Sequence, residues 1–200
     1  MGILDNVNLL FFWEGRGTVA TDNDLILVGL GANLANKLTV SPLATCQAAL
    51  TKLREHGVHE HGSSGWYVSA PVPQSDQNWY INKVSIIQTH LNPEKLLETL
   101  LAVEQCFGRV KSERWAQRPL DLDLLAFKRI ICKNSGKNHL NLPHPRMLKR
   151  RFVVDPLVEI APQWSHPLTR KTIKEVAKEM QQEQKLLGFS STIPDNSGNL

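Results

Sequence analysis

Residues 109–123 read Arg-Val-Lys-Ser-Glu-Arg-Trp-Ala-Gln-Arg-Pro-Leu-Asp-Leu-Asp, so that a cluster of cations runs directly into two alternating carboxylates. Asp121 and Asp123 alternate with leucines, which is the period of a half-buried β-strand. On that period both carboxylates leave the same face, roughly 7 Å apart at their Cα atoms, while the leucines enter a core. The stretch therefore predicts a strand that runs to about Phe127 and has one acidic face.

The residue types of this stretch suit phosphoryl chemistry on a nucleotide. Two carboxylates that point to the same side of a strand can bind a hard cation such as Mg²⁺, which is usually held by one or two carboxylates plus substrate phosphates. The arginines beside them supply forked donors for phosphate oxygens. The alternatives are a pair of surface carboxylates bound to neighbouring arginines, and a solvated cationic loop. The cations concerned are Arg109, Lys111, Arg114 and Arg118.

Patterns on either side of this stretch predict the element order βαββαβ. Helices are predicted over 42–57 and 93–108, each opened by a capping residue and a proline and closed by a glycine. Strands are predicted over 24–31, 64–70, 79–89 and 121–127. This order is the ferredoxin-like α+β plan. We expect a mixed sheet with helices on one face and the other face available for a ligand.

The remaining chain predicts additions to this sandwich and two terminal segments. We expect an extra C-terminal hairpin and helices, with a hairpin strand over 129–133, a helical stretch over 146–161 and a last helix capped by Thr169. Residues 1–22 are expected to form an N-terminal extension, 23–186 a single domain, and 187–200 a disordered tail rich in Ser, Asn, Gly and Pro.

Composition indicates an ordinary globular protein of 200 residues, 42% hydrophobic and 21% charged. The net charge of +4 is compatible with an anionic ligand but is too weak to argue for nucleic acid without a motif. Cys46 and Cys106 fall on apolar helix positions, so we expect buried, reduced thiols in a reducing compartment. The apolar run 9–13 follows no basic residue and is too short to span a membrane, so we expect no signal peptide and a cytoplasmic protein.

Several common motifs are incomplete or absent. Gly29-Leu-Gly31-Ala-Asn-Leu34 follows a strand as a dinucleotide fingerprint would, but Leu34 replaces the third glycine. The sequence contains no P-loop and no protein-kinase motif, so any use of ATP requires another arrangement. His56, His59 and His61 surround a helix-ending glycine without a matching acidic set, and we interpret them as a solvated turn.

Further markers lie on both sides of the two aspartates. They are Gly31-Ala-Asn-Leu34, Ser69-Ala-Pro71, Trp79-Tyr-Ile-Asn82, Glu104 with Gly108-Arg109-Val110, Leu142-Pro-His-Pro-Arg146 and Arg151-Phe-Val-Val-Asp-Pro-Leu-Val-Glu-Ile-Ala-Pro162. Together with the stretch from Arg114 to Leu124, they resemble the 6-hydroxymethyl-7,8-dihydropterin pyrophosphokinase family over about Leu25 to Trp164.

The resemblance implies an ATP-dependent diphosphotransferase with a ferredoxin-like fold. Such an enzyme transfers the β,γ-pyrophosphate of ATP to the hydroxymethyl group of 6-hydroxymethyl-7,8-dihydropterin and releases AMP, a step of folate biosynthesis. The resemblance also implies two Mg²⁺ ions as cofactors. We therefore expect ATP and the pterin as partners, no nucleic acid, no membrane, and a monomer.

Roles for individual residues also follow from the resemblance. Metal ligands are expected at Asp121 and Asp123, and the catalytic residues would be these two and Arg118. Pterin contacts are expected at Ser69, Val72, Tyr80, Asn82, Trp115 and Phe152. ATP contacts are expected at Glu104, Arg109, Lys111, Arg114, Arg118, His144 and Arg150. The loop with Arg114 and Trp115 would close over the site, although Ala116-Gln117 stands where relatives carry Gly-Pro.

The sequence also leaves open purely structural roles for several of these residues. The Asn82 amide could be satisfied by neighbouring backbone, Tyr80 and Phe152 could be core aromatics, and His144 could be a turn residue between prolines. A second class, an RNA-binding ferredoxin-like module, also stacks ligands on strand aromatics. The two aspartates on the ligand face and the absence of an RNP motif argue against that class.

Overall fold

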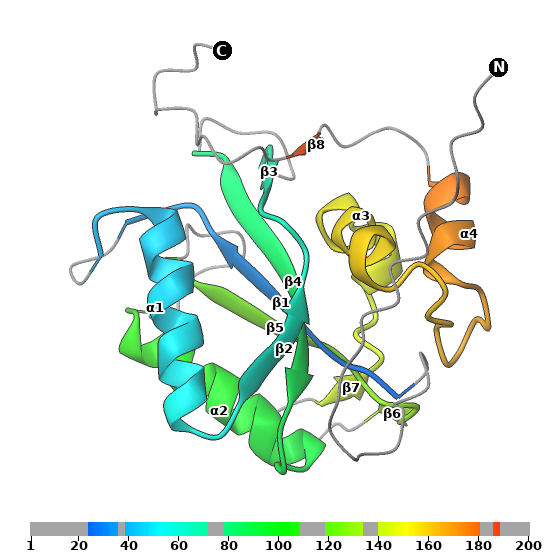
Figure 1. Ribbon diagram of the computed structural model, residues 1–200, viewed down its shortest axis with the longest axis horizontal. Helices are drawn as coiled ribbons and strands as arrows, with labels where there is room; N and C mark the ends of the chain where they lie inside the picture. The colour runs from blue at the N-terminus through cyan, green and yellow to red at the C-terminus, as the bar shows by residue number, and fades with distance from the viewer. Residues whose placement is uncertain are drawn as a thin grey trace, which may run out of the picture.

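The computed structural model describes residues 24–35, 39–71, 78–108, 119–133 and 140–180, and the backbone of 186–188. One six-stranded sheet lies at its centre, in the order β5-β1-β4-β3-β8, with β2 also paired to β4 (Figure 1). The strands are β1 (Ile26–Ala32), β2 (His59–Ser63), β3 (Tyr67–Ser69), β4 (Tyr80–Gln88), β5 (Asp121–Phe127) and β8 (Leu186–Gly188). The ferredoxin-like βαββαβ order is confirmed, because β2 and β3 together take the place of the second strand.

Three details of this sheet differ from the sequence prediction. Every pairing between its strands is antiparallel, so the sheet is not mixed. Of the strand predicted over 64–70, only Tyr67–Ser69 is a strand (β3), and β2 lies just before the predicted range. β8 pairs with β3, so residues 187 and 188 of the expected tail belong to the sheet, and the rest of that tail lies outside the described residues.

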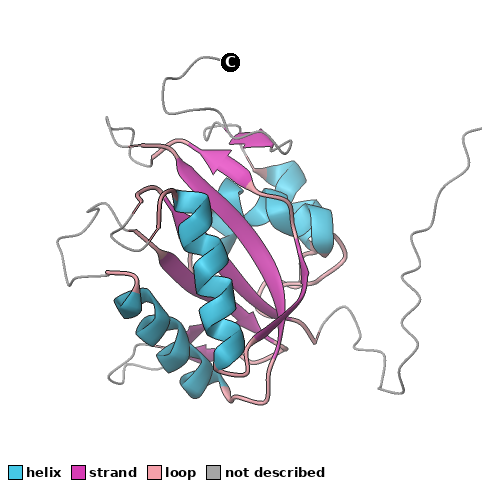
Figure 2. Cartoon of the chain, turned by 60° about the vertical axis from the view of Figure 1, so that its left-hand side comes forward, coloured by secondary structure: helices cyan, strands magenta, loops and turns pink. Residues whose placement is uncertain are grey.

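Helices α1 (Pro42–Glu55) and α2 (Pro93–Cys106) cover one face of the sheet (Figure 2). Each starts as predicted, because Ser41 Oγ accepts from Ala44 N at 3.1 Å and Asn92 Oδ1 accepts from Lys95 N at 2.9 Å. Each ends before a glycine in the left-handed region, with φ of +73° at Gly57 and +89° at Gly108.

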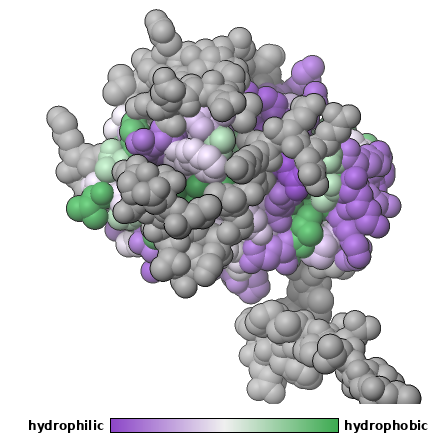
Figure 3. Space-filling view, turned by 90° about the horizontal axis from the view of Figure 1, so that it is seen from above, coloured by the Kyte–Doolittle hydropathy of each residue, from purple (hydrophilic) through white to green (hydrophobic). Residues whose placement is uncertain are grey.

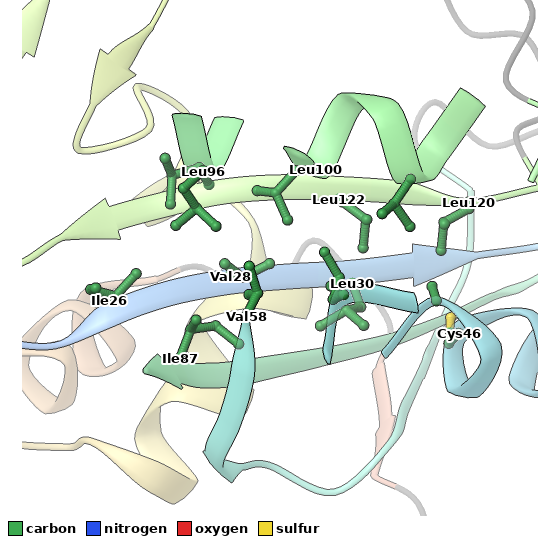
Figure 4. Close-up of a cluster of buried hydrophobic side chains, with 14 of the residues drawn as sticks. Ile26, Val28, Leu30, Cys46, Val58, Ile87, Leu96, Leu100, Leu120 and Leu122 are labelled. Atoms are coloured by element: carbon green, nitrogen blue, oxygen red, sulfur yellow. The ribbon is translucent and has the colours of Figure 1, made fainter. Parts of the chain in front are cut away.

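The first hydrophobic core lies between these helices and the sheet (Figure 4). Even-numbered residues of β1 point into it, as the alternation of a strand requires. Their partners include leucines of α2 and β5. The labelled members are Ile26, Val28, Leu30, Cys46, Val58, Ile87, Leu96, Leu100, Leu120 and Leu122. Of the two thiols expected to be buried, Cys46 is buried but Cys106 is exposed on the outer side of α2.

The opposite face is only partly free, because α3 (Arg151–Ile160) and α4 (Ile173–Glu179) pack against it (Figure 1). They form a second core with the other side of the sheet, which corrects the expectation of helices on one face alone. Strand residues that enter this core are Leu27, Val84, Leu125 and Ala126. The part of this face beyond them carries the polar residues that form the candidate site.

The segment between β5 and α3 also departs from prediction. Strand β6 (Cys132–Lys133) pairs with β7 (Asn141–Leu142) in a separate two-stranded sheet and does not return along β5. A short 3₁₀ turn, η1 (Met147–Lys149), leads into α3 within the predicted helical stretch.

Thr172, and not Thr169, caps α4, because Thr172 and Glu175 form a reciprocal capping box that the sequence also permits.

Surface properties agree with this architecture. Seen from the end of the molecule that carries β3 and β8, hydrophilic side chains gather on one side of the described surface and the hydrophobic areas among them are small (Figure 3). Among the described residues, no helix is long and apolar enough to cross a membrane.

Candidate active site

Strand register brings three predicted site residues onto one face of the sheet. Asn82 of β4 lies opposite Gly31 of β1, which in turn lies opposite Asp121 of β5. One step along, Gly29 lies opposite Asp123. Because paired residues of an antiparallel sheet point to the same face, Asn82 and both carboxylates project on the α3 side. Two strand spacings, roughly 10 Å, separate Asn82 from Asp121 in the same row.

Two glycines form the floor between these side chains. A Cβ added to Gly31 would lie 3.3 Å from Asn82 Oδ1, closer than ordinary van der Waals contact. A Cβ added to Gly29 would lie 3.4 Å from Leu125 Cδ1. The Asn82 amide thus lies close against Gly31 and the Leu125 side chain borders Gly29, but both glycines are only half-buried, so a flat ligand can approach the backbone of β1 here. The sequence analysis interpreted Gly29-Leu-Gly31 as an incomplete fingerprint and Gly31 also as part of a family marker, and it missed that glycines at alternate positions of a strand indicate close approach to the backbone.

The amide side of the site is a small hydrogen-bonded cluster. Asn82 Nδ2 donates to Ser69 Oγ at 2.9 Å and to the carbonyl of Tyr80 at 3.4 Å. Asn82 and Ser69 are buried, and Tyr80 is half-buried two residues before Asn82 on the same face. Both protons of the amide nitrogen are thus used within the protein, which leaves Oδ1, beside Gly31, as the atom that can meet a ligand.

The carboxylate side is built from β5 and the segment before α3. Arg150 Nη1 donates to Asp123 Oδ2 at 2.6 Å, and both side chains are mostly buried, 18% and 29% exposed. The Arg150 guanidinium also lies 5.4 Å from the centre of the Phe152 ring. One arginine therefore connects a predicted metal ligand to a predicted pterin contact.

His144 lies next to this pair, with its Nε2 4.0 Å from Asp123 Oδ1. Burial lowers the pKa of His144, and the guanidinium groups of Arg150 and Arg146 lower it further, although Asp123 acts in the opposite direction. The backbone N–H of Arg146 donates to Nδ1 at 3.2 Å, which assigns the proton of the neutral ring to Nε2. His144 is thus a neutral hydrogen-bond donor facing the site.

Glu104 makes a hydrogen bond within the protein that the sequence did not suggest. It is fully buried on α2, and its Oε1 accepts from the backbone N–H of Leu122 at 2.8 Å. Leu122 stands between the two aspartates on β5, at the edge of the sheet. Glu104 therefore holds the strand that presents the carboxylates, and its expected contact with ATP stays a prediction.

Six predicted site residues lie outside the described residues. They are Val72, Arg109, Lys111, Arg114, Trp115 and Arg118. The other nine predicted residues are all described. Ser69, Tyr80, Asn82, Asp121 and Asp123 lie on the sheet strands, and His144, Arg150 and Phe152 lie in the segment that leads into α3. Glu104 lies on α2, against β5.

The donor set fits a magnesium ion that is shared with phosphates. The two carboxylates on one strand face are the only oxygen ligands that the described part of the site offers, which is usual where substrate phosphates and water complete the coordination, while the Nε2–H of His144 can donate to a phosphate. Groups of three or more His, Cys, Asp or Glu that could form a complete protein-only site are not found within the described ranges. His59 and His61 are exposed on strand β2, so they are not in the turn that we expected.

Fold and site together define a ferredoxin-like α+β protein with an amide, a glycine floor and an acidic pair on one sheet face. Residues 27–162 match the family model of 7,8-dihydro-6-hydroxymethylpterin-pyrophosphokinase. A Synechocystis sp. protein named 2-amino-4-hydroxy-6-hydroxymethyldihydropteridine pyrophosphokinase is 38% identical over 156 residues, 77% of this chain and 75% of that protein. A Haemophilus influenzae protein of the same name is 38% identical over 135 residues, 67% of this chain and 79% of that protein. The chain belongs to the 7,8-dihydro-6-hydroxymethylpterin-pyrophosphokinase family.

Solved structures agree on the fold. A Plasmodium falciparum HPPK-DHPS chain superposes with a TM-score of 0.61 at 13% identity, covering 77% of this chain and 42% of that chain. Another HPPK-DHPS structure, in complex with substrates, gives a TM-score of 0.58 at 13% identity and covers 79% and 43%. This chain therefore spans less than half of those solved chains, and at such identity the likeness concerns the fold alone.

Proposed function

We propose that this chain transfers the β,γ-pyrophosphate of ATP to the hydroxymethyl group of 6-hydroxymethyl-7,8-dihydropterin and releases AMP, as a step of folate biosynthesis. The observation that carries the proposal is the row Asn82–Gly31–Asp121, in which an amide and an acid lie on either side of a glycine on one face of the sheet, in a chain of this family. The names of the bacterial relatives support the same activity.

The pterin would lie on the glycine floor. Its polar edge would meet Asn82, whose Oδ1 stands beside Gly31. Tyr80 lies on β4 and Phe152 on α3, and a flat heterocycle held between their rings would gain stacking energy. A site that pairs with a polar edge discriminates strongly, because an analogue lacking that edge leaves buried groups unpaired.

The triphosphate would lie on the carboxylate side. Asp121 and Asp123 would hold Mg²⁺, for which we propose two ions, and the metal would lower the pKa of the attacking hydroxyl and bind phosphate oxygens. Arg150 and the neutral His144 would donate to the phosphates, and Arg118 with the other cations of 109–118 would neutralise charge as the pyrophosphate moves.

Other expectations stay predictions. They are the monomeric state, the cytoplasmic location, the domain limits and the closure of the loop that carries Trp115. The RNA-binding alternative is not supported, because the family match and the named relatives are pyrophosphokinases.

AMP release tests the proposal. The chain should form AMP from ATP only when both the pterin and Mg²⁺ are present, and Asp123→Asn should reduce turnover by about a hundredfold or more. Asp155→Asn is the matched control, since Asp155 forms a similar, mostly buried ion pair with Arg151 within α3. Equal rates for Asp123→Asn and the wild type would contradict the metal assignment.

A further inference from the structure

We propose that Glu159 is a positioning residue that fixes α3, and with it Phe152, relative to the strand pair that holds Asn82. This inference rests on the proposed function, because it concerns affinity for the pterin. Glu159 lies within the motif from Arg151 to Pro162, but the resemblance assigns it no role.

Both carboxylate oxygens of Glu159 accept hydrogen bonds from residues of the β2–β3 region of the sheet. Oε1 accepts from the backbone N–H of Gly65 at 2.9 Å, and Oε2 accepts from Tyr67 Oη at 2.9 Å. Gly65 and Tyr67 lie at the junction between β2 and β3, more than 90 residues away in sequence. A single carboxylate thus connects the last turn of α3 to this junction.

Tyr67 is a direct neighbour of the hydrogen-bonded pair Asn82 and Ser69. It lies opposite Asn82 in the β3–β4 register, so both side chains project on the same face. Two residues further along β3, Ser69 accepts the hydrogen bond from Asn82. The group that Glu159 holds is therefore the immediate neighbour of the residue expected to select the pterin.

At the other end of α3, Phe152 projects from the same side of the helix as Glu159. Seven residues separate the two, which is two turns or about 10 Å along the axis. Arg150, the residue just before α3, forms an ion pair with Asp123 and so anchors the first turn of the helix to β5. Pro156 lies inside the helix and removes the backbone hydrogen bond to the Phe152 carbonyl, so the first turn depends more on such external anchors.

The Tyr67 contact persists across the working pH range. Burial raises the pKa of Tyr67 to about 12, and the hydrogen bond and negative charge of Glu159 act in the same direction. The phenol therefore stays protonated and continues to donate.

Glu159→Ala should weaken pterin binding while leaving ATP binding almost unchanged. The probe is 6-hydroxymethylpterin, titrated calorimetrically in the presence of Mg²⁺ and saturating α,β-methylene-ATP. We expect the pterin Kd to rise about three- to tenfold, the size of one or two hydrogen bonds at a solvent-exposed site. Glu159→Gln should restore most of the affinity, since its amide can accept from Gly65 and bind Tyr67 Oη. Tyr67→Phe should show a smaller loss.

Glu179→Ala is the control, because Glu179 forms an exposed ion pair with Lys171 on α4. Unchanged pterin affinity in both Glu159→Ala and Tyr67→Phe would overturn the inference, and so would an equal loss of affinity for pterin and nucleotide. A wild-type chain that binds no pterin would instead overturn the proposed function. The two failures are thus distinguishable.

Discussion

Replacement of Glu104 by alanine should destabilise the protein and impair catalysis together. Glu104 is fully buried, and it supplies the acceptor for the N–H of Leu122 on β5, the edge strand of the described sheet. A buried N–H without an acceptor costs about 1–3 kcal/mol, and truncation of a buried side chain adds a cavity. We therefore expect a loss of about 2–3 kcal/mol in the free energy of unfolding, which lowers Tm by about 4–12 °C for a domain of this size.

Thermal unfolding followed by circular dichroism measures the first effect, and AMP release at a temperature where the variant remains folded measures the second. Glu104→Gln keeps an acceptor oxygen and should lose much less stability. Glu94→Ala, at the exposed first turn of the same helix, is the control. A Tm for Glu104→Ala equal to that of the control would refute the view that this carboxylate supports β5.

The remaining predictions concern the floor, the amide and a buried histidine. Asn82→Ala should weaken pterin binding far more than ATP binding, and equal losses in calorimetry on each ligand would make Asn82 a structural residue. Gly31→Ala should also weaken pterin binding, because the new Cβ would lie 3.3 Å from Asn82 Oδ1 and must displace it; a pterin Kd equal to wild type would show that the floor has room. Burial lowers the pKa of His166, so this group stabilises the fold above its ordinary pKa of about 6.5 and loses that contribution as the pH falls. His166→Gln should therefore flatten the fall in Tm between about pH 6.5 and 5, and parallel pH curves for variant and wild type would contradict this.

Most of the βαββαβ frame was predictable, since its signals are local. Ser41 and Asn92 each stand before a proline and cap their helices as expected. The alternation around Asp121 and Asp123 defines both the strand and its acidic face. Each of these signals spans a few residues, and the tertiary structure does not override them.

The departures arise where local signals are weak or duplicated. His59–Ser63 contains no alternating apolar residues, so β2 depends on its pairing with β4 rather than on its own sequence. Thr169 and Thr172 both look like helix caps, and the Glu three residues after Thr172 completes a capping box that decides between them.

The site could be predicted in its chemistry but not in its arrangement. The family motifs identify Asn82, Asp121 and Asp123, whereas only the strand register shows that Gly31 lies between the amide and the acid. The roles of Glu104 and Glu159 depend on contacts 18 and more than 90 residues away in sequence, which no local pattern encodes.

The most direct test of the central claim follows the β-phosphorus of ATP. ATP labelled at that atom is incubated with the chain, Mg²⁺ and 6-hydroxymethyl-7,8-dihydropterin, and the products are separated. Transfer of the β,γ-pyrophosphate predicts that the label appears in the pterin product and that the nucleotide released is unlabelled AMP. Label retained in ADP would show transfer of a single phosphoryl group and would contradict the account.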